Sequence, residues 1–336
     1  MNDKLKQIAK YILFMAVGAG LFYLAFRNTE FEKLANDFRK ADYTYVILSI
    51  IMGYLAFISR GMRWVLLLEP LGKKPNTWNA IHSVTVGYFA NMLVPRAGEL
   101  ARCTALYQTD DIPVNRLFGT VILERVIDFL MLLFLVLLTL ILEFDLLMEL
   151  IDTAFSATQG TEDSNTGLYI KIAIGGVIVI GGVALYLLRE KFMLHPVYQK
   201  VRDFWDGIKE GLKSISQLKS KTPFILHTIF IWLMYYLMVY ICVFSLDATK
   251  DLNPSSGLLV MIAAGFGMVV PTPGGIGAYH YLVMLGLGVL GVASDDGVSF
   301  ATLVHTGQLV MTVITGTIAA GFLWRARRRK KMAASN

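Results

Sequence analysis

Six long apolar segments limit the folds open to this chain more than any other feature of its sequence. They span residues 12–26, 46–57, 126–142, 172–188, 229–244 and 303–324. A helix that crosses the hydrocarbon of a bilayer needs about 20 mostly apolar residues, and several of these segments approach that length. Charged residues make up 17% of the 336 residues, against about 25% in soluble domains. The sequence therefore predicts an all-α polytopic membrane protein.

Other protein classes fit the sequence less well. Basic residues precede the first apolar segment, as in a secretory signal, but no small-x-small cleavage site follows before Arg27, so we expect a retained anchor. Cys103 and Cys242 form no CxxC or metal-ligand spacing, and we expect neither a metal nor another cofactor. The net charge of +6 would suit nucleic acid, yet Lys and Arg of membrane proteins gather in cytoplasmic loops. We therefore expect no nucleic-acid partner.

The distribution of Lys and Arg predicts which segments face the cytoplasm. One set contains 19 of these residues and consists of the residues before 12, 69–78, 189–222 and 325–336. The opposite set contains five and consists of 27–42, 144–167, 247–255 and 294–298. Because basic loops stay on the cytoplasmic side, the counts predict a multi-pass protein of the inner (plasma) membrane with both termini in the cytoplasm.

Two breaks in apolar segments indicate an internal repeat. Residues 80–94 end in the break Pro-Arg-Ala-Gly at 95–98, and residues 256–270 end in Pro-Thr-Pro-Gly-Gly at 271–275. The first break aligns without a gap on the second, and the two share Met, Val, Pro and Gly. We therefore expect an inverted repeat of two halves, each with three spanning helices and one re-entrant broken hairpin, whose breaks meet near the membrane midplane. Chance similarity of two Pro/Gly breaks is the alternative.

The same topology divides the chain into segments. We expect a first membrane repeat at 1–145, an extracytoplasmic loop at 146–167, a second membrane repeat at 168–325 and a basic cytoplasmic tail at 326–336. Residues 189–222 combine an apolar stripe with basic residues, which predicts an amphipathic helix on the inner leaflet. A partner-binding role is the alternative for this helix. A further interfacial helix is expected within 27–42.

Eight charged residues lie in or beside segments apolar enough to be buried. They are Arg60, Arg63, Arg96, Glu99, Arg102, Glu124, Arg125 and Asp128. A charge at the centre of a membrane helix costs about 2.5–3.5 kcal/mol on insertion scales, so these residues must pair or face water. Five arginines against three carboxylates leave an excess of positive charge, and guanidinium groups bind phosphate or carboxylate in bidentate fashion. We therefore predict that these residues bind an anionic substrate.

Structural roles are the alternative for several of these charges. Arg60 and Arg63 can extend from the end of their helix to the cytoplasmic interface. Arg125 can neutralise the carboxylates of its own helix as a structural ion pair. Burial of Arg96 and Glu99, at the tip of the first break, is hardest to explain in this way.

The two breaks carry the remaining candidate residues for substrate binding. Asn91 precedes the first break, and Gly274 and Gly275 lie in the second, so backbone N–H groups there can approach an anion closely. His280 and His305 can titrate near neutrality. A hydrogen-bonded structural role is the alternative for both histidines.

These motifs resemble the membrane region of lysylphosphatidylglycerol synthases, also described as the flippase-like integral membrane family. The similarity is carried by residues 60–64, 91, 95–99, 102, 124–125 and 128 and by the run PTPGGIG at 271–277. The resemblance implies a lipid-translocating module over nearly the whole chain. His280 stands where the family usually has Glu, which alters the sign of a titratable charge. No soluble synthase domain follows Asn336, so we do not expect lysyl transfer.

The buried charges and the resemblance predict a transporter rather than an enzyme. We expect it to move an anionic or lipid-linked headgroup across the membrane through a polar cavity, with membrane lipid or a lipid-linked molecule as its substrate partner. One alternative is a glycosyltransferase that acts on polyprenyl phosphate, although the cytoplasmic loops contain neither a DxD pair nor a Gly-rich phosphate loop. The other is a scaffold for a lipid-modifying enzyme, a partner that would dock on 189–222.

Overall fold

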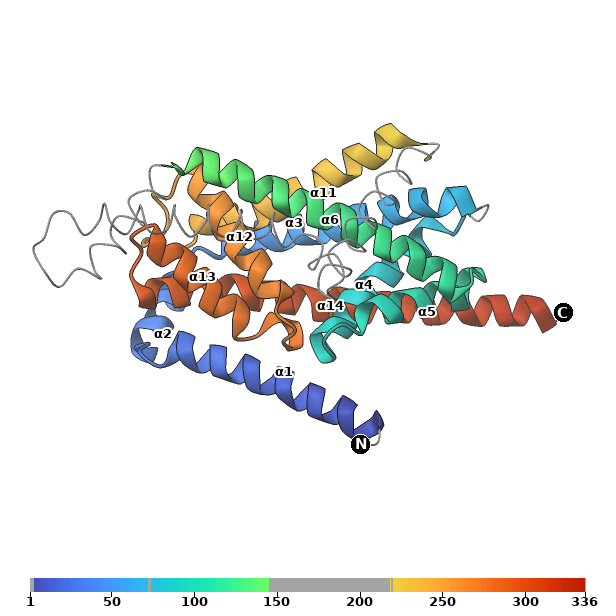
Figure 1. Cartoon of the computed structure of the whole chain (residues 1–336), viewed down its shortest axis with the longest axis horizontal. Helices are drawn as coiled ribbons and strands as arrows, with labels where there is room; N and C mark the ends of the chain where they lie inside the picture. Colours follow the sequence, from blue (N-terminus) through green and yellow to red (C-terminus); the bar gives the residue numbers. More distant parts are fainter. Residues whose placement is uncertain (1–2, 72–73, 145–217, 219, 336) are drawn as a thin grey trace, which may run out of the picture. The chain divides into compact units, whose positions relative to one another are not determined.

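The computed structural model describes residues 3–71, 74–144, 218 and 220–335, and these residues form helices and no β-strand (Figure 1). The longer helices are α1 (Asp3–Phe26), α2 (Phe31–Lys40), α3 (Tyr43–Leu68), α4 (Thr77–Leu93), α5 (Gly98–Asp110), α6 (Val114–Leu142), α11 (Lys221–Val243), α12 (Pro254–Val269), α13 (Ala278–Val289) and α14 (Ser294–Ser335). The short 3-10 helices are η1 (Glu69–Leu71) and η2 (Pro273–Gly275). The all-α class is therefore confirmed for the described residues.

Four of the described helices, α3, α6, α11 and α14, are long and apolar enough to cross a bilayer. Residues Tyr11–Phe26 of α1 pass the same test only together with α2, and the pair is bent by 83°. The expected spanning segment at 172–188, the loop at 146–167 and almost all of the amphipathic helix at 189–222 lie outside the described residues. The inverted arrangement of two halves therefore stays a prediction.

Two helices extend beyond their predicted apolar segments. Helix α6 begins at Val114 rather than at 126, so its charged residues lie inside the helix. Helix α14 runs from Ser294 to Ser335, so the expected loop at 294–298 is the start of this helix, and the expected tail, as far as residue 335, continues it. Asp295 and Asp296 in its first turn favour this start because carboxylates stabilise the positive end of the helix dipole.

Asparagine caps set the start of the first helix in each hairpin. Asn76 Oδ1 accepts a hydrogen bond from the backbone N–H of Trp78 at 2.9 Å, where α4 begins. Asn253 Oδ1 accepts one from the N–H of Ser256 at 2.8 Å, where α12 begins with Pro254 in its first turn. Each cap satisfies a backbone donor that has no partner within the helix. The caps therefore fix where both hairpins start.

Helices α3 and α11 pack against each other in opposite directions. The backbone N–H of Asp42, before α3, donates to the carbonyl of Ser245, after α11, at 3.0 Å. At the other end the Ser220 hydroxyl, before α11, donates to Glu69, after α3, at 3.4 Å. The two helices therefore run antiparallel and join the two halves of the sequence. They belong to one compact unit, which comprises residues 1–139 and 217–336.

A glycine allows α3 and α4 to pack at close range. A Cβ atom at Gly61 would lie 2.5 Å from the Cα of Ile81, closer than any side chain can approach. Membrane helices use small residues in this way so that their backbones come together. The first hairpin is therefore anchored against α3.

The two broken hairpins, α4–α5 and α12–α13, meet at their breaks. Helix η2 of the second break packs on α4, and α14 packs on both α4 and α13 (Figure 1). A Cβ atom at Gly274 would lie 3.3 Å from the Cγ of Met92. The second break thus contacts the last turn of α4, just before the first break, whereas the meeting of the two breaks near the membrane midplane stays a prediction.

Helix α2 is the short helix expected within 27–42, and no residue of it is fully buried. Lys33 Nζ lies 2.7 Å from a carboxylate oxygen of Asp296 at the start of α14. This hydrogen bond and the charge of Asp296 raise the pKa of Lys33 above its usual value. The hydroxyl of Ser299 also donates to Asp37 at 2.7 Å. Polar contacts therefore attach α2 to the start of α14.

Candidate functional site

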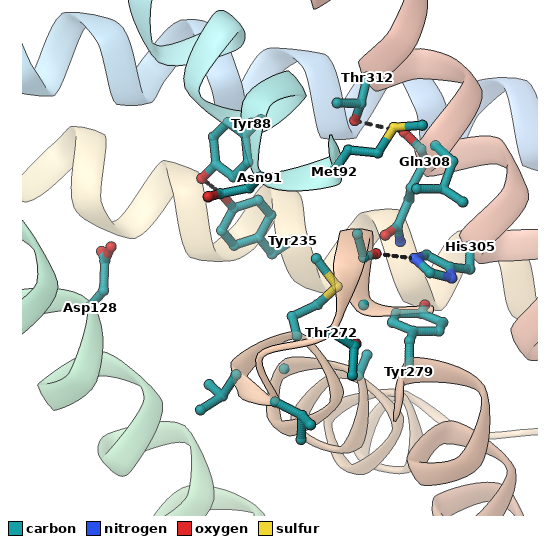
Figure 2. Close-up of a pocket in the computed structure, with 18 of the residues that line it drawn as sticks. Tyr88, Asn91, Met92, Asp128, Tyr235, Thr272, Tyr279, His305, Gln308 and Thr312 are labelled. Carbon is teal, nitrogen blue, oxygen red and sulfur yellow. Dashed lines mark hydrogen bonds between the residues drawn. The ribbon is translucent and has the colours of Figure 1, made fainter. Parts of the chain in front are cut away.

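A cavity of about 520 Å³ lies between the two breaks. Its wall includes residues of α3, α4, α6, α11, α12 and α14 and both prolines of the breaks, Pro95 and Pro271. In Figure 2 Asp128 projects from α6 on one side, His305 lies on α14 on the opposite side, and Tyr88 and Tyr235 lie between them. Five of the eight charged residues singled out in the sequence therefore line one cavity with the second break, namely Arg60, Arg96, Glu99, Arg125 and Asp128.

Arg60 is the centre of a buried network of ion pairs. Its Nη1 donates to Glu124 Oε1 at 2.8 Å and its Nη2 to Asp128 Oδ2 at 2.7 Å. Its Nε donates to the hydroxyl of Tyr235 at 2.7 Å, and this hydroxyl lies 3.0 Å from that of Tyr88. The Arg60 guanidinium therefore joins α3 to α6 and α11, and its tyrosine partners continue the network to α4.

Two more arginines complete this network. Arg63 Nη2 donates to Glu124 Oε1 at 3.1 Å and to Asp128 Oδ1 at 2.8 Å. Arg102 Nη2 lies 2.8 Å from Glu124 Oε2, and its guanidinium lies over the ring of Trp64 at 4.9 Å from the ring centre. Because Arg102 belongs to α5, Glu124 holds the first hairpin against α3 and α6.

The burial of this network excludes one structural alternative. The side chains of Arg63 and Glu124 are 0% exposed and that of Arg60 is 4% exposed. The alternative in which Arg60 and Arg63 extend to the cytoplasmic interface is therefore wrong, since both point to carboxylates of α6. Removing one partner of such a network leaves an uncompensated buried charge, which is strongly destabilising.

The remaining charges face the cavity. Arg125 is 48% exposed and Glu99 is 26% exposed, with Arg125 Nε 3.7 Å from Glu99 Oε1. The partners of Glu124 and Asp128 in direct contact are arginines of α3 and α5, whereas Arg125 forms no ion pair with them and acts on both carboxylates only from a longer distance. Arg125 and Glu99 instead form a half-exposed pair on the cavity wall.

Arg96 lies at the tip of the first break and also lines the cavity. Its backbone is left-handed, with φ of 64°, a conformation that is uncommon for a residue with a side chain. Within the described residues its guanidinium has no carboxylate partner. The buried network of Arg60, Arg63, Arg102, Glu124 and Asp128, called the inner network below, contributes only Arg60 and Asp128 to the cavity wall, and the Arg125–Glu99 pair is neutral. The exposed guanidinium of Arg96 therefore gives the wall its net positive charge.

Asn91 has a structural role that its position in the sequence did not reveal. Its Oδ1 accepts a hydrogen bond from the N–H of Gly98 at 2.7 Å, at the first residue of α5. A Cβ at Gly98 would overlap the carbonyl oxygen of Gly87, so only glycine fits there. The side chain of Asn91 therefore closes the first break, and the N–H of Gly98 is not free to bind an anion.

The glycines of the second break line the cavity, but their backbone groups are partly used within the protein. The N–H of Gly275 donates to the carbonyl of Thr272 at 3.2 Å, and His305 Nε2 lies 2.8 Å from the carbonyl of Gly274. Gly274 and Gly275 have φ of 58° and 80°, so glycine is required for the turn. The expected anion site on the N–H of Gly275 is therefore not supported.

His280 lies behind the cavity wall. Its ring is 5% exposed and packs against Phe22 and Phe26 of α1, with ring centres 6.0 and 5.6 Å apart. His280 is absent from the residues that line the cavity, whereas His305 is among them. The expectation that His280 contacts substrate is therefore corrected in favour of His305.

Sequence analysis missed most uncharged polar residues of the cavity. Tyr88, Tyr235, Thr272, Gln308 and Thr312 all line it. A polar side chain without charge is common in membrane helices and does not by itself mark a site. Two of them could have been found from their positions in the sequence, because Thr272 lies in the second break and Gln308 follows His305 by about one helical turn.

Comparison with known proteins places this architecture in a family. Residues 8–316 match the family described as the lysylphosphatidylglycerol synthase TM region. A UPF0104 membrane protein of Methanocaldococcus jannaschii is 24% identical over 306 residues, which cover 85% of this chain and 87% of the relative. A UPF0104 membrane protein of Methanothermobacter thermautotrophicus is 23% identical over 278 residues, or 78% and 80% of the two chains. No solved structure matches the chain significantly. The chain is a multi-pass membrane protein and belongs to the lysylphosphatidylglycerol synthase TM-region family.

Proposed function

We propose that this protein moves the headgroup of an anionic lipid across the membrane through the cavity between its two breaks. The observation that carries the proposal is the guanidinium of Arg96, which has no carboxylate partner among the described residues and lies on a wall that Arg60 and Arg125 also line. An arginine without a carboxylate partner is available to a phosphate, which it binds through two parallel hydrogen bonds. The protein therefore acts as a transporter and not as an enzyme.

The size of the cavity suits a lipid headgroup. Ligand sites in proteins commonly enclose about 300–1,000 Å³, and this cavity encloses about 520 Å³. The inner network keeps its own carboxylates occupied by arginine, so Glu124 and Asp128 do not present free negative charge to the substrate. A phosphate therefore meets a positive site that is held rigidly from behind.

An apolar edge of the cavity offers a path for the lipid chains. Phe129 of α6 and Met268 and Val269 of α12 line the cavity and are also exposed at the surface. Leu132 of α6 lies 3.7 Å from the position of a Cβ at Gly265 of α12, so the two helices approach one another there. The headgroup can enter between them while the chains stay in the bilayer, because these side chains are as apolar as lipid.

The contact between the two hairpins supports alternating access. In secondary transporters with inverted repeats, discontinuous helices from both halves form the substrate site, and one half moves against the other around it. Both breaks line this cavity, and the antiparallel helices α3 and α11 are the corresponding helices of the two expected repeats. Opening toward one side of the membrane then requires movement of one hairpin relative to the other.

Transport by purified protein in liposomes tests the proposal. A fluorescent phosphatidylglycerol is placed in both leaflets, and its loss from the outer leaflet is followed after addition of a membrane-impermeant quencher. We expect Arg96→Ala to slow exchange between leaflets about ten- to a hundredfold, since a hydrogen bond to a charged group contributes about 1.5–3 kcal/mol. Arg96→Lys should recover part of the rate, because an ammonium keeps the charge without the planar fork.

The matched control is Arg116→Ala, which removes an exposed arginine of α6 outside the cavity and should leave the rate at the parental value. Circular dichroism and gel filtration confirm that all variants are folded. If folded Arg96→Ala protein moves the lipid as fast as the parent, the charges are structural. The alternative that the protein is a scaffold for a lipid-modifying enzyme would then be favoured over a transporter.

A further inference from the structure

The wall of the cavity is charged at one end and uncharged at the other. The charged side chains belong to α3, the first hairpin and α6, whereas the second break and α14 contribute Thr272, His305, Gln308 and Thr312. Figure 2 shows Asp128 and His305 on opposite sides of the cavity, with Gln308 and Thr312 on the side of His305. No carboxylate or arginine from the second break or from α14 lines the described part of this wall. The two ends therefore suit different chemical groups of one ligand.

Polar atoms at the uncharged end lack hydrogen-bond partners within the described residues. Thr272 is 4% exposed and its Oγ1 has no partner, while its methyl group lies 3.2 Å from the position of a Cβ at Gly18 of α1. The Gln308 amide lies beside the Tyr279 hydroxyl, but Gln308 Nε2 and the Tyr279 hydroxyl form no hydrogen bond of good geometry. The indole N–H of Trp232, on another part of the wall, also lacks a partner.

Such atoms are unfavourable unless a ligand or water binds them. A buried donor or acceptor without a partner loses its hydration without compensation. The amide of Gln308 and the indole of Trp232 donate, and the hydroxyl of Thr272 both donates and accepts. Hydroxyl groups of a ligand can match this mixture because each of them donates one hydrogen bond and accepts others.

The same end is unsuited to a cation. A ligand ammonium donates only, and among the described lining residues the carboxylates Glu99 and Asp128 both belong to the charged end and are paired with arginine. Arg96 and Arg125 would in addition repel a cationic group in the cavity. The amino group of a lysyl ester, to which the family description refers, therefore has no favourable position at this site.

We propose that the end formed by the second break and α14 binds the hydroxyl groups of a polyol or sugar that is attached to the lipid phosphate. The phosphate contacts the arginines, and the neutral extension contacts Thr272 and Gln308. This inference rests on the proposed function, since it names the class of headgroup that the same cavity takes. The substrate class is thus an anionic glycerol- or sugar-bearing phospholipid and not an aminoacylated, cationic one.

Transport of three lipids in the liposome assay tests the inference. The probes are phosphatidylglycerol, phosphatidic acid and lysyl-phosphatidylglycerol with the same labelled chains. We expect the parent to move phosphatidylglycerol fastest, and the double variant Thr272→Val/Gln308→Leu to lower the ratio of its rate to that of phosphatidic acid about tenfold. The control Thr315→Val removes a hydroxyl that bonds to the Met311 carbonyl on the same helix, outside the cavity, and should keep the parental ratio.

A binding measurement separates failure of this inference from failure of the proposed function. The thermal unfolding of the parent in detergent is followed with dihexanoyl-phosphatidylglycerol or dihexanoyl-phosphatidic acid at equal concentration, because a ligand of the folded state raises its stability. A larger rise in unfolding temperature with the glycerol lipid than with phosphatidic acid, lost in the double variant, supports the subsite. If the parent shows this rise but transports no lipid, the subsite stands and the proposed function is overturned. Equal rates and equal rises for the two lipids, or faster transport of the lysyl lipid, overturn the subsite while transport itself stands.

Discussion

Arg96 combines a strained backbone with an exposed side chain that has no carboxylate partner. Its left-handed backbone costs about 1–2 kcal/mol for a residue with a side chain, and its guanidinium has no carboxylate partner within the described residues. Strained residues of this kind persist where the surrounding structure fixes them, and they cluster at functional sites. Here the surrounding structure is the break closed by Asn91 and Gly98. Backbone and charge therefore both support the assignment of Arg96 to substrate binding.

The inner network predicts a different effect for Glu124. Its carboxylate contacts Arg60, Arg63 and Arg102, so Glu124→Gln leaves three buried guanidinium groups with Asp128 as their remaining carboxylate. We expect the variant to lose about 3–5 kcal/mol of stability, as when one partner of a buried ion pair is removed. The measurement is thermal unfolding of the purified protein in detergent.

The control for Glu124→Gln is Glu32→Gln, which removes an exposed carboxylate on α2 and should leave the midpoint of unfolding unchanged. Arg96→Ala should likewise unfold close to the parental temperature, because it breaks no pair within the described residues. A Glu124→Gln midpoint equal to that of the control would mean that the network is hydrated and does not hold the helices.

The charges of the site could be predicted from the sequence, whereas their partners could not. A charge in an apolar segment is costly, and that cost alone indicates that the eight residues gather. Which carboxylate each arginine reaches depends on how α3, α5 and α6 are rotated about their axes, and residue spacing does not contain this information. Glu99 and Arg102 are three residues apart on α5, yet Glu99 lies beside Arg125 and Arg102 contacts Glu124.

At the scale of elements, breaks were easier to predict than helix ends. Proline and glycine interrupt a helix for a local reason, and both predicted breaks lie between described helices. The ends of α6 and α14 were missed because their outer turns are polar and therefore resemble loops in composition. The start of α14 depends in part on Lys33 and Asp37 of α2, which contact Asp296 and Ser299; such contacts are visible only in three dimensions.

Gly277, which follows the second break, lies where only glycine fits. Gly277 has φ of 83°, and a Cβ there would lie 2.8 Å from the backbone nitrogen of Phe22 and overlap the carbonyl oxygen of Gly18. We expect Gly277→Ala to lower stability by more than the roughly 1–2 kcal/mol cost of a left-handed alanine, because α1 must also move. Thermal unfolding in detergent measures the change.

Gly288→Ala is the matched control for Gly277→Ala. Gly288 lies inside α13, and a Cβ there meets no atom within 4 Å. Alanine favours a helix interior over glycine by up to about 1 kcal/mol, so this variant should keep or raise the unfolding temperature. Equal effects of the two substitutions would show that α1 does not pack against the second break as described.

At the scale of the whole molecule, the site depends on both halves of the sequence. The arginines come from the first half and the uncharged wall from the second, and α3 and α11 hold the halves together. Neither half alone encloses the cavity. This division explains why the charges indicated an anion site from the sequence, while the groups proposed to recognise the rest of the headgroup were found only from the contact between the breaks.

The antiparallel pair α3 and α11 leads to a prediction about membrane topology. Lys74 follows the end of α3 that lies near Ser220, and Asp247 follows the end of α11 that lies near Asp42. Both helices are long enough to span, so cysteines introduced at these two positions should lie on opposite sides of the membrane. Because the basic segments are predicted to be cytoplasmic, we expect a membrane-impermeant maleimide to label Lys74→Cys only in inside-out vesicles and Asp247→Cys only in intact cells.

The native Cys103 and Cys242 are buried and are replaced by alanine to lower the background. Labelling of both positions from the same side would contradict the crossing of α3 and α11, and labelling with the sides exchanged would reverse the orientation while leaving the cavity between the two breaks intact.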